Sequence, residues 1–143
     1  METKKIIIFI IIIIILGIAL LLVMREVKGN ILVITDKNEY SLQDHIRVQI
    51  QNKSGRNACF SSCYPYLIER KDGSWNQYEY ADCAKTDLTN LCLAQGEKKA
   101  FELALPSIVS GLHRLALGVC LGCQVGEVFK GDKKFYSNEF LIK

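Results

Sequence analysis

Six cysteines are the residues of this chain whose type and spacing could do chemistry. They are Cys59, Cys63, Cys83, Cys92, Cys120 and Cys123, and the last two form a C-x-x-C motif in "RLALGVCLGCQVGE". Such a pair can be a redox centre, half of a zinc site, or two structural cysteines at a loop. The choice depends on the cell compartment and on the elements that position the sulfur atoms.

The first thirty residues bear on the compartment. The run from Ile6 to Met24, "IIIFIIIIIILGIALLLVM", has no charged or strongly polar side chain. As a helix it would be about 28 Å long, close to the thickness of the hydrocarbon core of a bilayer. Residues 6–24 are therefore predicted to be a transmembrane helix or uncleaved signal anchor, between a cytoplasmic tail (residues 1–5) and a linker (residues 25–30). A cleaved signal peptide is the alternative, but no suitable pair of small residues follows the run.

The charges around the run are balanced, with Lys4 and Lys5 before it and Arg25 and Lys28 after it. The short tail favours a cytoplasmic N-terminus. This predicts a single-pass protein of the cell membrane, with residues 31–143 outside the cytoplasm. In a small domain outside the cytoplasm, an even number of cysteines is typical of a disulfide framework.

The spacing of the cysteines does not select among the pairings. We favour Cys83–Cys92, which would close the irregular segment "AKTDLTNL", with Cys59 and Cys63 bonded across to Cys120 and Cys123. Two alternatives remain open: a zinc site built from the C-x-x-x-C and C-x-x-C pairs, and a redox site. The disulfide interpretation requires no metal or cofactor. Redox chemistry favours a thiolate at a helix N-terminus, whereas "CLGCQVGEVF" follows a strand pattern.

Beyond residue 30 the sequence changes from a continuous apolar run to alternation. The segment "HIRVQIQN" places Ile46, Val48 and Ile50 on one face, and "KAFELAL", "HRLALGV" and "NEFLI" alternate in the same way. A period of two is typical of half-buried strands. Asp72-Gly73 predicts a hairpin that joins "YLIER" to "WNQYEY". About seven strands without an amphipathic helix predict an all-β, antiparallel β-sandwich.

Four segments resemble the prokaryotic immunoglobulin-like domains of surface and secreted proteins: "KNEYSLQDHIRVQIQNKS", "LAQGEKKAFEL", "GLHRLALGV" and "FYSNEFLI". The resemblance implies that residues 31–143 form one extracytoplasmic immunoglobulin-like domain. With that strand order, all six cysteines would gather at one end of the sandwich. Gln43-Asp44 departs from the family's Gly-acid turn, and His113 stands where the family usually has Tyr.

Several other residues are candidates for a role. The aromatic segment "NACFSSCYPY" makes Phe60, Tyr64 and Tyr66 a candidate contact loop, since loops on a rigid sandwich often bind partners. His113 is expected on the core face, with its ring bonded to the backbone, and His45 is expected on the solvent face. Trp75, Tyr78 and Tyr80 are expected to pack across strands, with a recognition surface as the alternative. Asn52-Lys53-Ser54 fits the N-glycosylation pattern.

The net charge of +3 is modest, and no basic run interleaves with aromatic residues. Nucleic acid is therefore not the predicted partner. Because no nucleophile–base motif accompanies the histidines, an enzyme is not predicted. We predict a membrane-anchored, non-enzymatic surface protein that binds an unknown protein or envelope ligand. A proteinase inhibitor is one alternative, since "IERKDGSWNQY" resembles the intracellular proteinase inhibitors, and a cysteine-cluster metal or redox protein is the other.

Overall fold

A computed structural model of the chain describes residues 13–15, 17, 31–78, 83, 86–104, 108–131 and 133–143. Residues 13–15 and 17 are helical and exposed, and within the described residues no helix is long and apolar enough to cross a bilayer. The rest of the predicted membrane segment lies outside the described residues, as do the predicted tail and linker.

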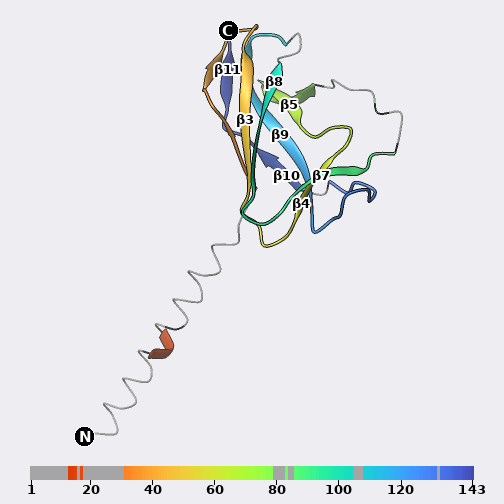
Figure 1. Cartoon of the computed structure of the whole chain (residues 1–143). Helices are drawn as coiled ribbons and strands as arrows, with labels where there is room; N and C mark the ends of the chain where they lie inside the picture. The colour runs from red at the N-terminus through yellow and green to blue at the C-terminus, as the bar shows by residue number, and fades with distance from the viewer. Residues whose placement is uncertain are drawn as a thin grey trace, which may run out of the picture.

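From residue 31 onward the described chain forms strands in two sheets, so the predicted all-β class is confirmed (Figure 1). Eleven strands are described instead of about seven, because several are only two to five residues long. They are β1 (Ile31–Thr35), β2 (Glu39–Tyr40), β3 (His45–Asn52), β4 (Ala58–Ser61), β5 (Leu67–Asp72), β6 (Ser74–Tyr78), β7 (Thr89–Leu93), β8 (Lys98–Ala104), β9 (Gly111–Leu121), β10 (Lys133–Tyr136) and β11 (Phe140–Ile142).

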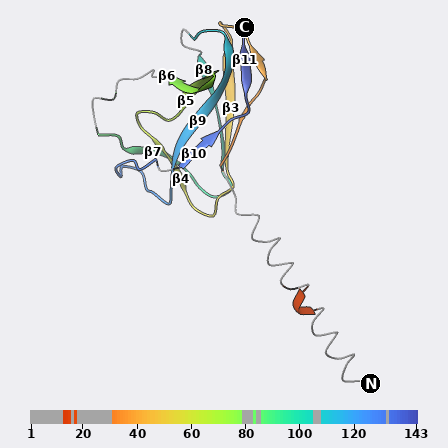
Figure 2. The ribbon, with the colours of Figure 1, turned by 180° about the vertical axis from the view of Figure 1, so that it is seen from behind.

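The smaller sheet has the order β1-β3-β8, and β9 is the central strand of the larger one. Along one edge β9 pairs with β10 and β11, which lie beside it in Figure 2. Along its other edge β9 pairs with β4 and β5. The strand β7 pairs with β4, β6 pairs with β5, and β2 adds to β11 in parallel. The eleven-residue β9 therefore positions most of the larger sheet.

The hydrophobic core lies between the two sheets. From β3, Ile46, Val48 and Ile50 enter it, and β9 contributes every second residue from Leu115 to Val119. All of these side chains are buried, so the core-facing residues predicted for these two strands are confirmed, although Ala116 between Leu115 and Leu117 is buried as well. The hairpin at Asp72-Gly73 is confirmed as well: Gly73 has a φ of +66°, and Asp72 pairs with Ser74 across it.

Asn52 joins the two sheets and is completely buried. Its Nδ2 donates to the backbone oxygens of Leu93 on β7 and of Arg56, both at 2.8 Å. Its Oδ1 accepts from the backbone N–H and the hydroxyl of Ser54. Its amide is therefore engaged inside the folded domain, and the match to the glycosylation pattern is explained by a structural turn.

Candidate functional site

The cysteines form three disulfides, Cys59–Cys92, Cys63–Cys83 and Cys120–Cys123. The prediction that all six form disulfides is confirmed, but the favoured pairing is wrong. Cys83 bonds to Cys63 instead of Cys92, and Cys120 bonds to Cys123 instead of crossing to the segment of Cys59 and Cys63. Since every sulfur is in a disulfide, none is available as a thiolate ligand for zinc.

The pairing follows from the position of β4 between β7 and β9. Cys59, which was expected in a loop, lies in this strand directly opposite Cys92 on one side and Cys120 on the other. Directly opposite residues of neighbouring strands project from the same face of a sheet. The Cα atoms of Cys59 and Cys92 are 4.0 Å apart, which matches the closely spaced type of antiparallel pair.

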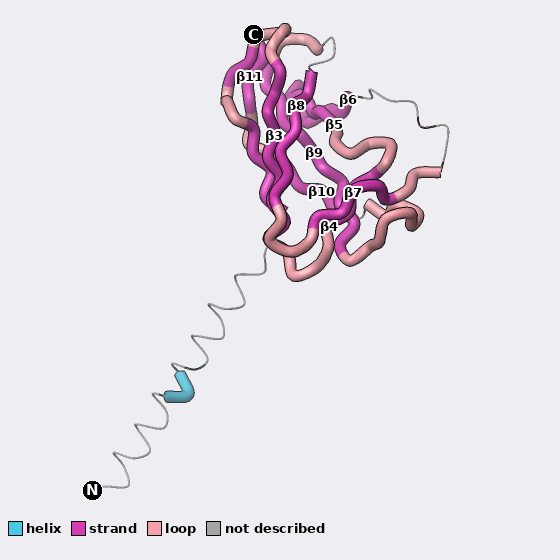
Figure 3. Tube along the Cα trace, in the orientation of Figure 1, coloured by secondary structure: helices cyan, strands magenta, loops and turns pink. Residues whose placement is uncertain are grey.

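This row of cysteines lies on the face of the larger sheet that points away from the core. Ala58 and Phe60 belong to the core cluster, so Cys59 between them points outward. Cys59 is nevertheless completely buried, because the turn after β9 folds over it. Its Sγ lies 3.0 Å from the carbonyl oxygen of Cys123. The loop that continues from this turn runs beside β4 and β7 (Figure 3), where Gly126 donates its N–H to the Thr89 carbonyl.

Gly122 allows the turn to close. Its φ is +88°, in the left-handed region that favours glycine. Its N–H donates to the carbonyl oxygen of Asn57 at 2.7 Å, which extends the pairing of β9 with β4 by one residue. The predicted gathering of cysteines is thus observed for Cys59, Cys92, Cys120 and Cys123.

The connection from β4 to β5 is organised by Asp87, a residue that the sequence patterns did not single out. The hydroxyl of Ser61 lies 2.7 and 2.8 Å from its two carboxylate oxygens. The same hydroxyl accepts the backbone N–H groups of Cys63 and Tyr64. The signal that could have indicated a turn is the pair Ser61-Ser62, since serine hydroxyls often bond the backbone two or three residues on.

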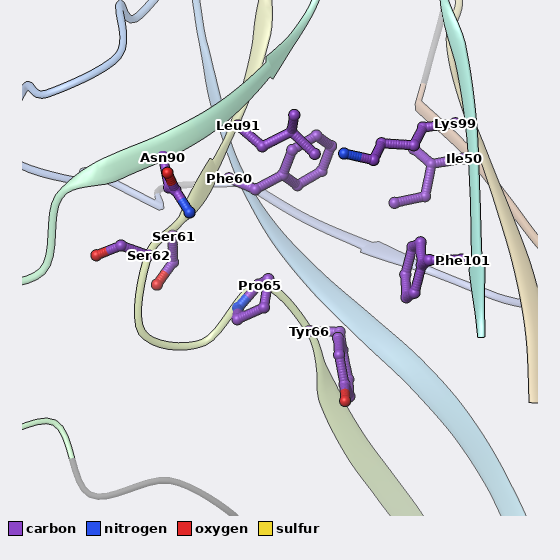
Figure 4. Close-up of a pocket in the computed structure, with 10 residues that line it drawn as sticks. All are labelled: Ile50, Phe60, Ser61, Ser62, Pro65, Tyr66, Asn90, Leu91, Lys99 and Phe101. Carbon is purple, nitrogen blue, oxygen red and sulfur yellow. The ribbon is translucent and has the colours of Figure 1, made fainter. Parts of the chain in front are cut away.

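An aromatic groove of about 470 Å³ opens between the two sheets (Figure 4). It lies beside β7 and β8, the edge strands of the larger and the smaller sheet. Its lining comes from β3, β4, β7, β8 and the connection before β5, and consists of Ile50, Phe60, Ser61, Ser62, Pro65, Tyr66, Asn90, Leu91, Lys99 and Phe101.

The rings of Tyr66 and Phe101 stack across the groove, with centroids 6.0 Å apart and planes 28° apart. Burial raises the pKa of the Tyr66 hydroxyl. The Lys99 side chain reaches toward Phe60 and Leu91 from the opposite wall (Figure 4). The groove thus combines apolar and aromatic surface with one cation, a composition typical of binding sites.

The three predicted contact residues are distributed over two sites. Phe60 and Tyr66 line the aromatic groove, but Phe60 is a buried strand residue and not part of a loop. Tyr64 lines a smaller groove of about 190 Å³, together with Asp87 and Phe129. A contact role for these residues stays a prediction.

The histidines lie where the sequence predicts them. His113 is completely buried, and its Nδ1 is 2.8 Å from the carbonyl oxygen of Gly111, whereas His45 is exposed. Burial lowers the pKa of His113, and the nearby Arg70 cation lowers it further. His113 Nε2 has no hydrogen-bond partner. These features describe a neutral imidazole in the core.

Trp75 takes part in packing across strands. The guanidinium of Arg114 lies between the rings of Trp75 and Tyr136, at 4.1 and 3.8 Å from their centroids. It also pairs with the buried carboxylate of Glu69 at 2.7 Å. Tyr78 packs against His113, and Tyr80 lies outside the described residues.

Comparisons with known proteins leave the family open. No family model matches the chain, and no curated protein matches it. Among solved structures, the chain is similar to a beta-glucosidase from Listeria innocua, seen in complex with glucose and, as a mutant, with laminaribiose. The identity is 17%, the TM-score is 0.34, and the match covers 80% of this chain but 16% of that enzyme. A likeness this distant has no bearing on function.

Proposed function

We propose that this chain is a membrane-anchored, non-enzymatic binding protein of the cell surface. In this proposal residues 6–24 are a single-pass anchor, and residues 31–143 form an immunoglobulin-like sandwich outside the cytoplasm. The apolar run supports the anchor, since its length suits a bilayer. The three disulfides support the location, because such bonds persist in oxidising compartments.

The observation that supports binding is the aromatic groove beside β8. No described strand pairs with the outer edge of β8, so its backbone groups on that side can accept an added strand. An extended peptide suits this arrangement: its backbone would pair with β8, while its apolar side chains enter the groove between Tyr66 and Leu91. An acidic residue of the peptide would pair with Lys99.

Peptide selection tests the groove. A phage-displayed library of linear peptides would be panned against the full chain in detergent micelles, and the selected peptides would be titrated calorimetrically. Phe101→Ala and Tyr66→Ala should each weaken binding at least about tenfold, since a buried aromatic contact contributes roughly 1.4 kcal/mol or more. Ile34→Ala is the matched control, because Ile34 is an exposed apolar residue on β1, outside the groove. Equal affinity for all three variants would refute the groove as the site.

The anchor is tested separately. The full chain, expressed in bacteria, should stay in the membrane pellet after alkaline carbonate extraction, and protease added to spheroplasts should digest residues 31–143. Replacing Leu16 and Leu20 with lysine should release the protein, because a charge at the centre of a span costs about 2.5–3.5 kcal/mol. A wild-type protein in the soluble fraction would disprove the anchor and leave the groove untouched.

A further inference from the structure

We propose that Cys59, Cys92, Cys120 and Cys123 form a thiol–disulfide exchange centre. In this centre, reduction by a dithiol moves the disulfide of Cys59 from Cys92 on β7 to Cys120 on β9. The proposal goes beyond the binding role, and it depends only on the arrangement of three neighbouring strands.

Cys59 has a cysteine directly opposite it on both sides. In an antiparallel sheet, a residue that forms a closely spaced pair with one neighbour forms a hydrogen-bonded pair with the other. The 4.0 Å between the Cα atoms of Cys59 and Cys92 identifies theirs as the closely spaced pair. The Cα atoms of Cys59 and Cys120 are then expected about 5.5 Å apart. Disulfides span Cα distances of roughly 4.4–6.8 Å, so the spacing expected for Cys59 and Cys120 lies within the range that a disulfide can bridge.

The three cysteines are also aligned for the reaction. A thiolate displaces a disulfide partner by attacking one sulfur along the line of the S–S bond. Neighbouring strands are about 4.8 Å apart, and they place Cys120, Cys59 and Cys92 in a row across β9, β4 and β7. A thiolate on Cys120 therefore approaches the sulfur of Cys59 from the side opposite Cys92, the leaving group.

The electrons come from a dithiol, either a small molecule or a protein. One thiolate of the dithiol attacks the sulfur of Cys123 and releases Cys120 as a thiolate. Its second thiolate resolves the mixed disulfide, which frees Cys123 and leaves the reagent oxidised to a disulfide. Cys120 then attacks Cys59, and Cys92 leaves as a thiolate that takes up a proton. Two electrons have reduced one protein disulfide to two thiols, on Cys92 and Cys123.

Accessibility favours this order of events. Cys123 is partly exposed, whereas Cys120 is only 5% exposed and Cys59 is completely buried. Cys92 is also partly exposed. Reduction that begins there reaches the same end state, since the released Cys59 thiolate would attack Cys120 and free Cys123.

The exchange would change the wall of the aromatic groove. The bond between Cys59 and Cys92 attaches the edge strand β7 to β4. This edge strand supplies Asn90 and Leu91 to the groove. After the exchange, β7 would be held by hydrogen bonds and packing alone, so a dithiol could loosen one side of the groove.

Thiol mapping on the full chain tests the exchange. The oxidised protein would be titrated with dithiothreitol until Cys123 becomes reactive, quenched with acid, alkylated with N-ethylmaleimide in denaturant, and mapped by mass spectrometry without reduction. Two similar disulfides should differ by less than about tenfold in population, so Cys92 should be labelled in at least about a tenth of the molecules that are labelled on Cys123, together with a peptide cross-linked through Cys59 and Cys120. Label confined to Cys120 and Cys123, with Cys59–Cys92 intact, would overturn the proposal.

Two serine variants provide a matched pair. Cys123→Ser leaves Cys120 unpaired within the row, so label should again appear on Cys92. Cys120→Ser removes the same disulfide but leaves Cys123, which lies outside the row, so label should be confined to Cys123. Label confined to Cys120 in Cys123→Ser, or label on Cys92 in Cys120→Ser, would contradict an exchange along the row of Cys120, Cys59 and Cys92. Fluorescence of Trp75, the only tryptophan, shows whether each variant is folded.

Discussion

Replacing Asn52 with alanine should remove a buried hydrogen-bonding centre that joins the two sheets. The side chain makes four hydrogen bonds of 2.6–2.9 Å, to Ser54, Arg56 and Leu93. It has no exposed surface, so water cannot take the place of the lost partners without opening the core. Lys53 and Gly55 of the same turn are exposed, so the buried Asn52 is the structural centre of this turn.

The size of the effect follows from the groups that lose a partner. The carbonyl oxygen of Arg56 keeps the Ser54 hydroxyl at 2.9 Å, whereas the buried N–H of Ser54 loses its acceptor and the carbonyl of Leu93 loses a donor. A lost hydrogen bond costs about 0.5–1.5 kcal/mol, and a buried group left unpaired costs about 1–3 kcal/mol. We expect the free energy of unfolding to fall by about 2–4 kcal/mol, a large part of the roughly 5–15 kcal/mol that stabilises a domain.

Urea unfolding of the oxidised full chain in a mild detergent, followed by Trp75 fluorescence, measures this loss. Asn57→Ala is the matched control, since Asn57 is exposed and its replacement should change stability by less than about 0.5 kcal/mol. Asn52→Asp keeps the acceptor for Ser54 but turns a carboxylate toward two carbonyl oxygens, so it should be at least as damaging as alanine. If Asn52→Ala behaved like Asn57→Ala, or if aspartate were well tolerated, hydrogen-bond donation by Asn52 would not be the source of stability.

The same unfolding measurement checks three further predictions. Because burial lowers the pKa of His113 below its ordinary value of about 6.5, the unfolded state binds more protons than the folded state at acidic pH. The stability that depends on neutral His113 should therefore be complete above about pH 6.5 and decline as the pH falls below that value. His113→Phe should flatten this decline. If His45→Gln removed the decline instead, the titrating group would be His45 and the prediction would be wrong. Burial and a hydrogen bond to a carboxylate raise the pKa of Tyr40 to about 12. The stability that protonated Tyr40 contributes to the fold should therefore be complete below about pH 10 and decline from there toward pH 12. If Tyr40→Phe left the dependence of stability on alkaline pH unchanged, this prediction would be contradicted. Glu69→Gln should lower the free energy of unfolding by roughly 3 kcal/mol, since it leaves the partly buried Arg114 without its anion. A loss below about 1 kcal/mol would mean that the pair behaves as a surface ion pair.

Much of the fold could be predicted because strand patterns are local. The alternation of Ile46, Val48 and Ile50 indicates a buried face whatever the neighbouring strand is, and the structure buries all three. The turn at Gly73 depends on residues next to it in the sequence. His113 could be placed in the core for the same reason, since its neighbours at a spacing of two are apolar.

The groove could not be predicted in the same way. Phe60 and Phe101 are 41 positions apart and belong to different sheets, and no short pattern shows that both border one groove. The segment "ACFS" of β4 is too short to show a period of its own, so the sequence predicts a loop for Cys59 and Phe60 where the structure has a strand. No local pattern indicates the role of Asp87, because that role depends on Ser61, which lies 26 positions earlier at the end of β4.

By itself, the sequence determined that this is a β protein with six cysteines in disulfides, because strand periodicity and cysteine number are properties of the chain. Which cysteines bond was decided only by the tertiary structure. The order of strands across a sheet sets which side chains face one another, and that order places β4 between β7 and β9. The C-x-x-C motif thus lies beside a second disulfide, in line with the sulfur that it could attack.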